Sequence, residues 1–274
     1  MDERYSEIIK SKPVEISDPE KRTSLISDID SRSDCLLSDM NGSIPGKCSR
    51  CSMIYERYDS HEVEEEKESL IKKILTLEWA MFQLVENEDG RAICQDSPDV
   101  FKVMRSSQAK SWTVAVLRSY LEDLEMAKRE SRNLLSEKYA RMMQYTRPTR
   151  YAEIAWKLPE LEQGVNSLIE RLVGIMVRWE QELETKYPNV LREGRPITSA
   201  DDSPWVTSFE TYMRGELMTY SKKTLTLYLN DVLEQEKYGK NGAETILLNT
   251  VRQYGFETLQ EANEKIEQEK EQDI

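Results

Sequence analysis

The sequence predicts an all-α fold: a single orthogonal or bundle-like domain of about nine or ten helices behind a flexible N-terminal extension. From residue 62 onward, apolar residues recur at spacings of three and four, the period of an amphipathic helix. No segment alternates apolar and polar residues as a half-buried strand does, and no longer unit repeats. With 274 residues, of which 38% are hydrophobic and 32% charged, the chain can bury a sizeable core.

The polar N-terminal part differs in composition from the rest of the chain. Residues 1–60 are rich in Ser, Asp and Lys and have few periodic apolar positions, so we predict a flexible extension there. The helical domain is expected over residues 62–270. Its first helix is HEVEEEKESLIKKILTLEWAMFQLVEN, whose acidic first turn suits the positive end of the helix dipole. A loop around Gly90 follows.

Start and stop signals divide the remainder of the domain. Ser97 and Pro98 are typical of an N-cap and a first helical position. Thr207 and Glu210 have the spacing of a capping box, which predicts another helix start. Residues 188–206 form the one long irregular connection, and such loops are often functional. Further helices are expected at DVFKVMRSSQ, Trp112–Lys128, NLLSEKYARMMQY, Tyr151–Trp156, Leu161–Leu183, Lys222–Tyr238, Ala243–Tyr254 and from Thr258 onward.

Charge and hydropathy argue against two classes of partner. The formal net charge is −13, whereas phosphate contacts to nucleic acid need a local excess of Lys and Arg. No run approaches the roughly 20 apolar residues of a membrane helix. The start MDERYSEIIK lacks the basic and apolar regions of a signal peptide. We therefore expect a cytoplasmic protein that binds neither nucleic acid nor membrane.

Cysteine and histidine usage limits the chemistry. Cys48 and Cys51 form a CxxC, and Cys35 and His61 nearby allow a zinc site to be considered. The spacing matches no standard zinc finger, so ordinary thiols are favoured and no metal ligand is assigned. His61 is the only histidine, and its favoured interpretation is a solvated surface residue. A single histidine argues against His-assisted hydrolases, His-ligated zinc enzymes and ferritin-like di-iron sites. The sequence identifies no cofactor.

Three glutamates stand where leucine would be expected. Glu78 has apolar neighbours at three and four residues on both sides, and Glu180 lies in the longest apolar stripe. Glu216 completes a stripe with Tyr220. A carboxylate that faces the core is costly unless a cation or a hydrogen-bond donor pairs with it. Each glutamate could therefore be a structural ion pair or reach water, or the three could share a polar site in the core.

Two kinds of counter-charge could satisfy these carboxylates. Arginine offers a planar fork for bidentate pairing, and Mg²⁺ or Mn²⁺ needs only oxygen ligands. Arginine is favoured, because no acidic doublet lies convincingly on an inward helix face. The arginines near helix ends or apolar stripes are Arg91, Arg105, Arg141 and Arg214.

Other charged pairs have structural interpretations. Glu122 and Glu125 form an E-x-x-E, a spacing found in helical nucleotide pyrophosphatases, but a solvated acidic face is favoured. Arg141 and Arg214 each follow a glutamate by four residues, so we expect a surface pair Glu137–Arg141 and a second i,i+4 pair Glu210–Arg214.

One segment collects hydrogen-bonding side chains near two predicted helix starts, where an anion could bind. Cys94 lies in this segment and is expected to be a small buried residue, since a nucleophilic thiolate would need its pKa lowered by the nearby arginines. The segment is GRAICQDSPDVFKVMRSSQAKSW, with Arg91, Gln95, Arg105, Gln108 and Trp112 as its candidate ligand-binding residues.

Four stretches carry a family resemblance: ILTLEWAMFQLVENEDGRAICQD, FKVMRSSQ, SYLEDLEMAKRESRNLLSEKYARMM and TSFETYMRGELMTYSKKTLTLY. Together they resemble a bacterial family known as domain of unknown function 4125, over about residues 65–260. The resemblance implies a domain boundary that leaves residues 1–60 outside. It implies no activity, because the family has none assigned, and no catalytic residue is carried over.

The leading hypothesis is a cytoplasmic helical domain that binds or transforms a small anionic metabolite in a polar pocket. Arg91, Arg105 and Arg214 would clamp the anion. The glutamates would orient those arginines or act as general acid and base with a raised pKa. The candidate catalytic residues are Glu78, Glu180 and Glu216, and the candidate ligand-binding residues are Arg91, Gln95, Arg105, Gln108, Trp112, Arg141, Arg214 and Tyr220.

Two alternatives stay open. The first is a non-catalytic helical interaction or regulatory module, in which the glutamates are structural ion pairs. The second is a carboxylate-dependent Mg²⁺ or Mn²⁺ enzyme that acts on nucleotides. Substrate, reaction and oligomeric state do not follow from the sequence.

Overall fold

The computed structural model describes residues 49–86, 90–192 and 194–272, with side chains between residues 61 and 270. The described residues form eleven α-helices and contain no strand, which confirms the all-α prediction. The α-helices are α2 (Ser49–Gln83), α3 (Pro98–Lys110), α4 (Val114–Arg129), α5 (Leu134–Thr146), α6 (Pro148–Ile154), α7 (Val165–Lys186), α8 (Pro188–Arg192), α9 (Phe209–Leu217), α10 (Lys222–Lys237), α11 (Gly242–Gln253) and α12 (Leu259–Gln272), and the 3-10 helices are η3 (Ile93–Asp96), η4 (Ala155–Lys157) and η5 (Ser199–Asp201).

Two boundaries differ from the prediction. The first long helix already begins at Ser49, so part of the expected extension is helical, while residues 1–48 lie outside the described residues. The expected irregular connection over residues 188–206 contains the short helix α8 and the turn η5. The described residues from Glu66 onward belong to one compact unit. All contacts described below lie among residues 66–272.

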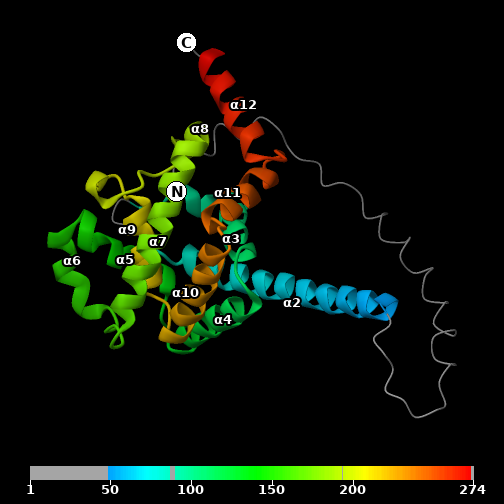
Figure 1. The fold of residues 1–274 in the computed structure, drawn as a ribbon. Coiled ribbons are helices and arrows are strands. Elements are labelled where there is room, and N and C mark those ends of the chain that lie inside the picture. Colours follow the sequence, from blue (N-terminus) through cyan, green and yellow to red (C-terminus); the bar gives the residue numbers. More distant parts are fainter. Residues whose placement is uncertain (1–48, 87–89, 193, 273–274) are drawn as a thin grey trace. The chain divides into compact units, whose positions relative to one another are not determined.

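The helices from α3 onward pack in a crossed arrangement rather than as one parallel bundle (Figure 1). α5 contacts α6 on one side and α9 on the other, and α7 contacts α8, α9, α10 and α11. α3 packs on α11, and α4 packs on α10. The apolar stripes of these helices supply fully buried side chains such as Leu117, Leu172 and Leu225. No described helix combines the length and apolar character needed to cross a membrane.

Several helices start at side-chain caps. The predicted start of α3 is confirmed, with Ser97 as its N-cap residue and Pro98 at the first helical position, although the Ser97 hydroxyl donates to the Ile93 carbonyl instead of capping the helix. The capping box predicted from Thr207 is wrong, because Ser208 is the N-cap of α9. Glu210 instead accepts a hydrogen bond from the Ser199 backbone N–H at 2.8 Å.

A glycine permits the close contact between α5 and α9. A Cβ at Gly215 would lie 3.0 Å from the Lys138 carbonyl oxygen and 2.7 Å from Met142 Cγ. Since α5 carries Lys138 and α9 carries Glu216, this contact brings a cation and a carboxylate from two helices together.

Candidate functional site

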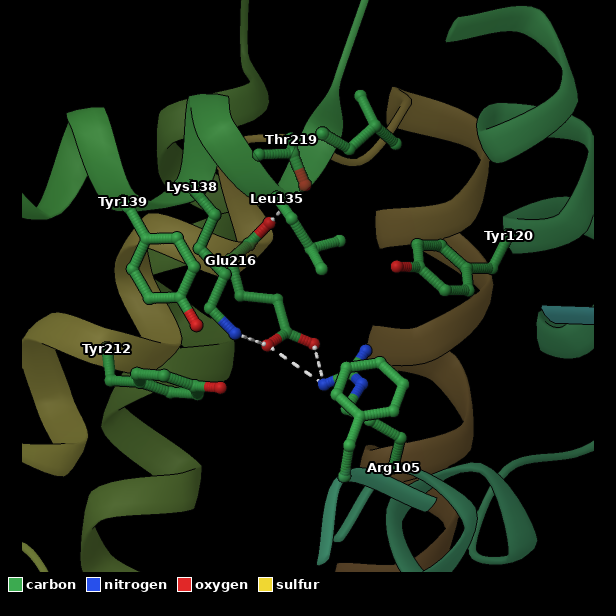
Figure 2. Close-up of a pocket in the computed structure, with 10 residues that line it drawn as sticks. Arg105, Tyr120, Leu135, Lys138, Tyr139, Tyr212, Glu216 and Thr219 are labelled. Atoms are coloured by element: carbon green, nitrogen blue, oxygen red, sulfur yellow. Dashed lines mark hydrogen bonds and ion pairs between the residues drawn. The ribbon is translucent and has the colours of Figure 1, made fainter. Parts of the chain in front are cut away.

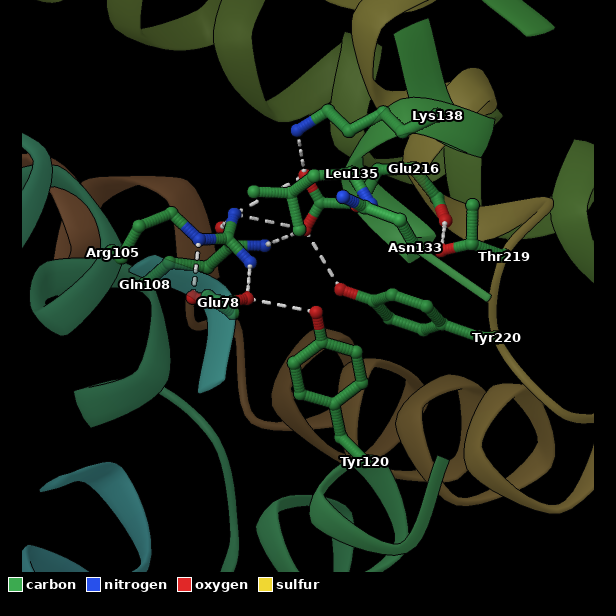
Figure 3. A network of polar contacts seen from close by, with 10 residues as sticks. All are labelled: Glu78, Arg105, Gln108, Tyr120, Asn133, Leu135, Lys138, Glu216, Thr219 and Tyr220. Carbon is green, nitrogen blue, oxygen red and sulfur yellow. Dashed lines mark hydrogen bonds and ion pairs between the residues drawn. The ribbon is translucent and has the colours of Figure 1, made fainter. Parts of the chain in front are cut away.

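A network of polar side chains lies in the core where α2, α3, α4, α5 and α9 meet (Figure 3). Glu78 of α2 and Glu216 of α9 are 1% and 2% exposed. Both are surrounded by apolar side chains along their own helices, as the sequence pattern indicates. The packed helices therefore exclude water from two carboxylates.

Arg105 of α3 joins the two carboxylates. Its Nε donates to Glu78 Oε2 at 2.9 Å, and its Nη2 donates to Glu78 Oε1, which gives a bidentate pair. Its Nη1 donates to Glu216 Oε1 at 3.0 Å and to Gln108 Oε1 at 2.7 Å. A single guanidinium thus connects helices that lie far apart in the chain.

Two tyrosines complete the inner side of the network. Tyr120 donates its hydroxyl to Glu78 Oε1 at 2.7 Å, and Tyr220 donates its hydroxyl to Glu216 Oε1 at 2.7 Å. The two rings lie 4.6 Å apart between centroids, and the indole of Trp112 meets both rings edge-on. This aromatic group closes the network off from the side of α4 and α10.

Lys138 of α5 supplies the second cation. Its Nζ donates to Glu216 Oε2 at 2.5 Å, although its side chain is only 6% exposed. Its ammonium also lies 3.5 Å from the centroid of the Tyr212 ring, a cation–π contact. Glu78 and Glu216 therefore meet two cations, Arg105 and Lys138, and the four charges cancel.

The charges fix the protonation of the network. Burial by itself would raise the pKa of Glu216, but Arg105 and Lys138 outweigh burial and hold that pKa well below its usual range. Burial and the neighbouring carboxylates raise the pKa values of Tyr120 and Tyr220. Their hydroxyls therefore stay protonated and act as donors. The prediction of a raised pKa for Glu216 is wrong, because Arg105 and Lys138 stabilise its ionised form.

A cavity lies on the outer side of the network (Figure 2). Including its open mouth, the hollow comprises about 350 Å³, of which about 20 Å³ can hold the centre of a water molecule. That space is enough for one or two ordered waters. The residues that line it are Phe101, Arg105, Tyr120, Leu134, Leu135, Lys138, Tyr139, Tyr212, Glu216 and Thr219.

Two hydroxyls at this cavity are unpaired. Figure 2 shows Tyr139 and Tyr212 with their hydroxyls turned toward the space beside the Lys138 ammonium. Neither hydroxyl has a hydrogen-bond partner among the residues that the structure describes. Burial raises the pKa of Tyr139, with a further contribution from Tyr212, so Tyr139 keeps its proton. Arg195 lies against the Tyr212 ring, with its Cζ 4.8 Å from the centroid.

The structure brings five of the candidate residues into one network. Arg105 bonds to Glu78 and Glu216, and Glu216 in turn accepts hydrogen bonds from Gln108 and Tyr220. A sixth candidate packs behind them, since the ring of Trp112 is buried against the tyrosines. The indole Nε1 is buried without a partner, so Trp112 contributes packing rather than a hydrogen bond.

Glu180 does not join the other two glutamates. It lies on α7, does not line the cavity, and makes no hydrogen bond or ion pair with any described residue. Burial raises the pKa of Glu180 from 4.5 to about 7. The structure therefore joins Glu78 and Glu216 in one network and leaves Glu180, on α7, outside it.

Arg91 and Gln95 hold the end of α2 instead of a ligand. The buried amide of Gln95 donates to the carbonyls of Phe82 and Val85 at 2.9 and 3.0 Å. Arg91 donates to Asp96 Oδ1 at 2.8 Å and to the Gln95 carbonyl at 2.9 Å. These contacts satisfy backbone groups that a helix end leaves unpaired.

Arg141 and Arg214 also lie outside the network. Arg141 donates to the Pro159 carbonyl at 2.7 Å, and Glu137 pairs with Arg132, so the expected Glu137–Arg141 pair is wrong. Arg214 does form the expected i,i+4 pair with Glu210, at 2.9 Å. Arg214 also forms a bidentate pair with Glu170, through Nε and Nη2, each at 2.9 Å. None of the three arginines Arg91, Arg141 and Arg214 lines the cavity.

Four residues of the site were missed by sequence reasoning. Lys138 follows Leu134 and Leu135 by four and three residues and precedes Met142 by four. A charged residue within an apolar stripe is the pattern that predicted Glu78, and it also predicts a buried Lys138. The missed tyrosines carry no such signal, because a tyrosine in an apolar stripe is ordinary. They are Tyr120, Tyr139 and Tyr212.

Part of the metal and thiol predictions falls on residues outside the described part of the chain. Among the described side chains, no three Asp, Glu, His or Cys residues gather as a metal site would require. Cys35, Cys48 and the side chain of Cys51 lie outside the described residues. Cys94 is a partly buried free thiol. Glu122 pairs with exposed Lys223, in agreement with a solvated acidic face.

Comparisons with known proteins identify the family. A family model described as Protein of unknown function (DUF4125) matches residues 68–264, which confirms the resemblance drawn from the four stretches. Neither curated proteins nor solved structures give a match. The match covers all of the residues that form the network and the cavity.

Proposed function

The chain belongs to the DUF4125 family, and we propose that it binds a small anionic ligand in the cavity beside Lys138. The observation that carries the proposal is a set of unused hydrogen-bonding groups around a hollow. Tyr139 and Tyr212 present unpaired hydroxyls next to a buried ammonium. Both tyrosines are partly buried, and polar groups in such a place usually pair with a ligand or with water.

The polar groups of the network are satisfied within the protein, whereas the hydroxyls of Tyr139 and Tyr212 at the cavity have no partner among the described residues. The carboxylates of Glu78 and Glu216 accept several hydrogen bonds each, so they need no ligand. Lys138 uses one of its three N–H donors on Glu216, which leaves donors for an incoming anion. The aromatic rings and leucines around the ammonium lower the local dielectric and strengthen such a contact.

A ligand screen with matched variants tests the proposal. We expect one or more small anions from a panel of carboxylates, phosphates and sulfate to raise the melting temperature of the full chain. The Tyr139→Phe, Tyr212→Phe double variant should fold with wild-type stability and lose most of that shift. Tyr238→Phe is the control, because Tyr238 is 65% exposed and lies away from the cavity.

Two results would contradict the proposal. One is the absence of any shift across the whole panel. The other is an equal shift in the wild type, the double variant and the control, since a non-specific anion effect does not depend on cavity hydroxyls. The catalytic roles predicted for Glu78 and Glu216 stay a prediction, and a binding experiment does not require them.

A second candidate, a non-catalytic interaction module, is favoured by two exposed tryptophans. Trp156 is 78% exposed and Trp205 is 82% exposed, whereas large aromatic side chains are usually found in cores or interfaces. On this interpretation the chain forms a complex through these side chains. Light scattering of the wild type and of the Trp156→Ala, Trp205→Ala double variant tests it, and an unchanged monomer in both would contradict self-association.

A further inference from the structure

The charged side chains in and beside the network favour a ligand with a particular negative charge. Arg105 and Lys138 are neutralised by Glu78 and Glu216, which leaves no net charge in the network. Arg195 is the additional cation, lying against the ring of the cavity residue Tyr212.

Arg195 has no carboxylate partner among the described residues. Its Nη1 donates to the Thr207 carbonyl oxygen at 3.0 Å, and a carbonyl carries no formal charge. The five charged side chains therefore sum to one positive charge. A single negative charge restores neutrality in this partly buried place, whereas a dianion would leave an uncompensated charge.

The size and chemistry of the cavity suit a carboxylate. The cavity offers about 20 Å³ to the centres of water-sized groups, which is room for the two oxygens of a carboxylate. The donors beside this space are the Lys138 ammonium and the hydroxyls of Tyr139 and Tyr212 (Figure 2). Three donors can satisfy both oxygens of a planar carboxylate.

Part of the cavity wall is apolar. Phe101, Leu134 and Leu135 line it together with the ring of Tyr139. Apolar atoms of a ligand placed there would lose contact with water, which favours binding in proportion to the area they bury. A strongly hydrated group such as a sugar or a second phosphate finds no polar side chain on this wall.

We propose that the ligand class is a small monocarboxylate with an apolar body, its carboxylate held by Lys138, Tyr139 and Tyr212 and its body against Phe101, Leu134 and Leu135. This inference rests on the proposed anion site and narrows it. It distinguishes an apolar carboxylic acid from phosphate esters, which carry about two negative charges at neutral pH.

Titration calorimetry with the full chain and four probes tests the ligand class: benzoate, hexanoate, benzamide and inorganic phosphate. We expect benzoate or hexanoate to bind at least roughly tenfold more tightly than benzamide, since the amide lacks the charge that strengthens each hydrogen bond. We also expect the Tyr139→Phe, Tyr212→Phe variant to lose roughly tenfold in affinity for the acids, because each replacement removes one donor to a charged oxygen. Tyr238→Phe should bind as the wild type does.

The outcomes separate this inference from the proposed site. Tighter binding of phosphate than of both acids would overturn the monocarboxylate class and leave the anion site standing. Equal binding of benzoate and benzamide would overturn recognition of the charge. Binding of none of the four probes, with no anion active in the wider screen, would overturn both proposals.

Discussion

The inner and outer sides of the Glu216 network use the same side-chain types in different ways. On the inner side, the hydroxyls of Tyr120 and Tyr220 donate to carboxylates and are buried with them, although Tyr120 also lines the cavity. On the outer side, the hydroxyls of Tyr139 and Tyr212 lie at a cavity without a partner among the described residues. A paired hydroxyl contributes to the stability of the fold, whereas an unpaired one contributes only when a ligand or water reaches it. The inner side therefore stabilises the fold, and the outer side is the one at which we propose that a ligand binds.

The largest expected effect comes from removing the carboxylate that both sides share. Glu216→Ala leaves Arg105 and Lys138 without one of their two carboxylates, and an uncompensated buried charge costs about 3–5 kcal/mol of unfolding free energy. Urea unfolding measures the loss. Glu170→Ala is the control, because Glu170 is 56% exposed and its pair with Arg214 should contribute less than about 1 kcal/mol. Equal losses in the two variants would show that Glu216 is not the centre of the network.

The next effect tests the inner side directly. Tyr120→Phe and Tyr220→Phe each remove a hydrogen bond to a charged oxygen, so each should lower the free energy of unfolding by about 1.5–3 kcal/mol. Urea unfolding of Tyr139→Phe and Tyr212→Phe provides the contrast, with changes within about 0.5 kcal/mol expected. Similar losses for all four variants would remove the distinction between the two sides.

A substitution at Gly215 tests whether the close contact between α5 and α9 stabilises the network. Gly215→Ala places a methyl group against the Lys138 carbonyl oxygen and Met142, so we expect a loss of roughly 1–3 kcal/mol from overpacking. Gly174→Ala in the middle of α7 meets no atom within 4 Å and should instead stabilise the protein by about 0.5–1 kcal/mol. Melting of both variants measures this. Stabilisation by both would mean that α5 and α9 can separate at little cost.

The smallest expected effect concerns a carboxylate outside the network. The pKa of Glu180 is raised to about 7, above its value in the unfolded chain, so folding binds a proton between the two values. The contribution of Glu180 is fully present below the unfolded pKa and is lost as pH rises through about 7. Between about pH 5 and pH 8, wild-type stability should fall by roughly 1–2 kcal/mol more than that of Glu180→Gln. Identical pH profiles would contradict this difference.

Glu216 responds to pH in the opposite direction. Its pKa is held below that of the unfolded chain, so its contribution is present above the unfolded pKa and is lost as pH falls. The two glutamates are the same residue type in similar apolar stripes. The difference in sign comes from Arg105 and Lys138, which reach one of them and not the other.

Local patterns predicted most of the fold. Ten helices were expected from apolar periodicity and punctuation, and the eleventh, α8, is a five-residue helix within the predicted irregular connection. Periodicity works because each helix must bury one apolar face. The helix start at Ser97 and Pro98 was predicted correctly, whereas the capping box at Thr207 was not. A hydroxyl can bond to any of several nearby backbone groups, as Ser97 does with the Ile93 carbonyl, and its spacing in the chain does not decide which one it meets.

The candidate site was predicted in part. The cost of a lone buried carboxylate identified Glu78 and Glu216, and Arg105 is the cation that both contact. The same reasoning placed Glu180 with them, since a stripe on one helix does not show which other helices it faces. Lys138 also lies within an apolar stripe, but a long lysine side chain can reach water from such a position, so the sequence pattern is less informative for a cation than for a glutamate.

The chain sequence established that two acids lie within apolar helix faces and must have counter-charges, since an unpaired buried charge is too costly to keep. It did not establish which cation each acid meets, or which tyrosine hydroxyls remain unpaired. Those pairings join α2, α3, α5 and α9 across long separations in the chain, as in Arg105 to Glu216 and Lys138 to Glu216. They depend on how closely helices approach and cross, which packing around Gly215 sets, and a periodic pattern along one helix carries no information about that approach.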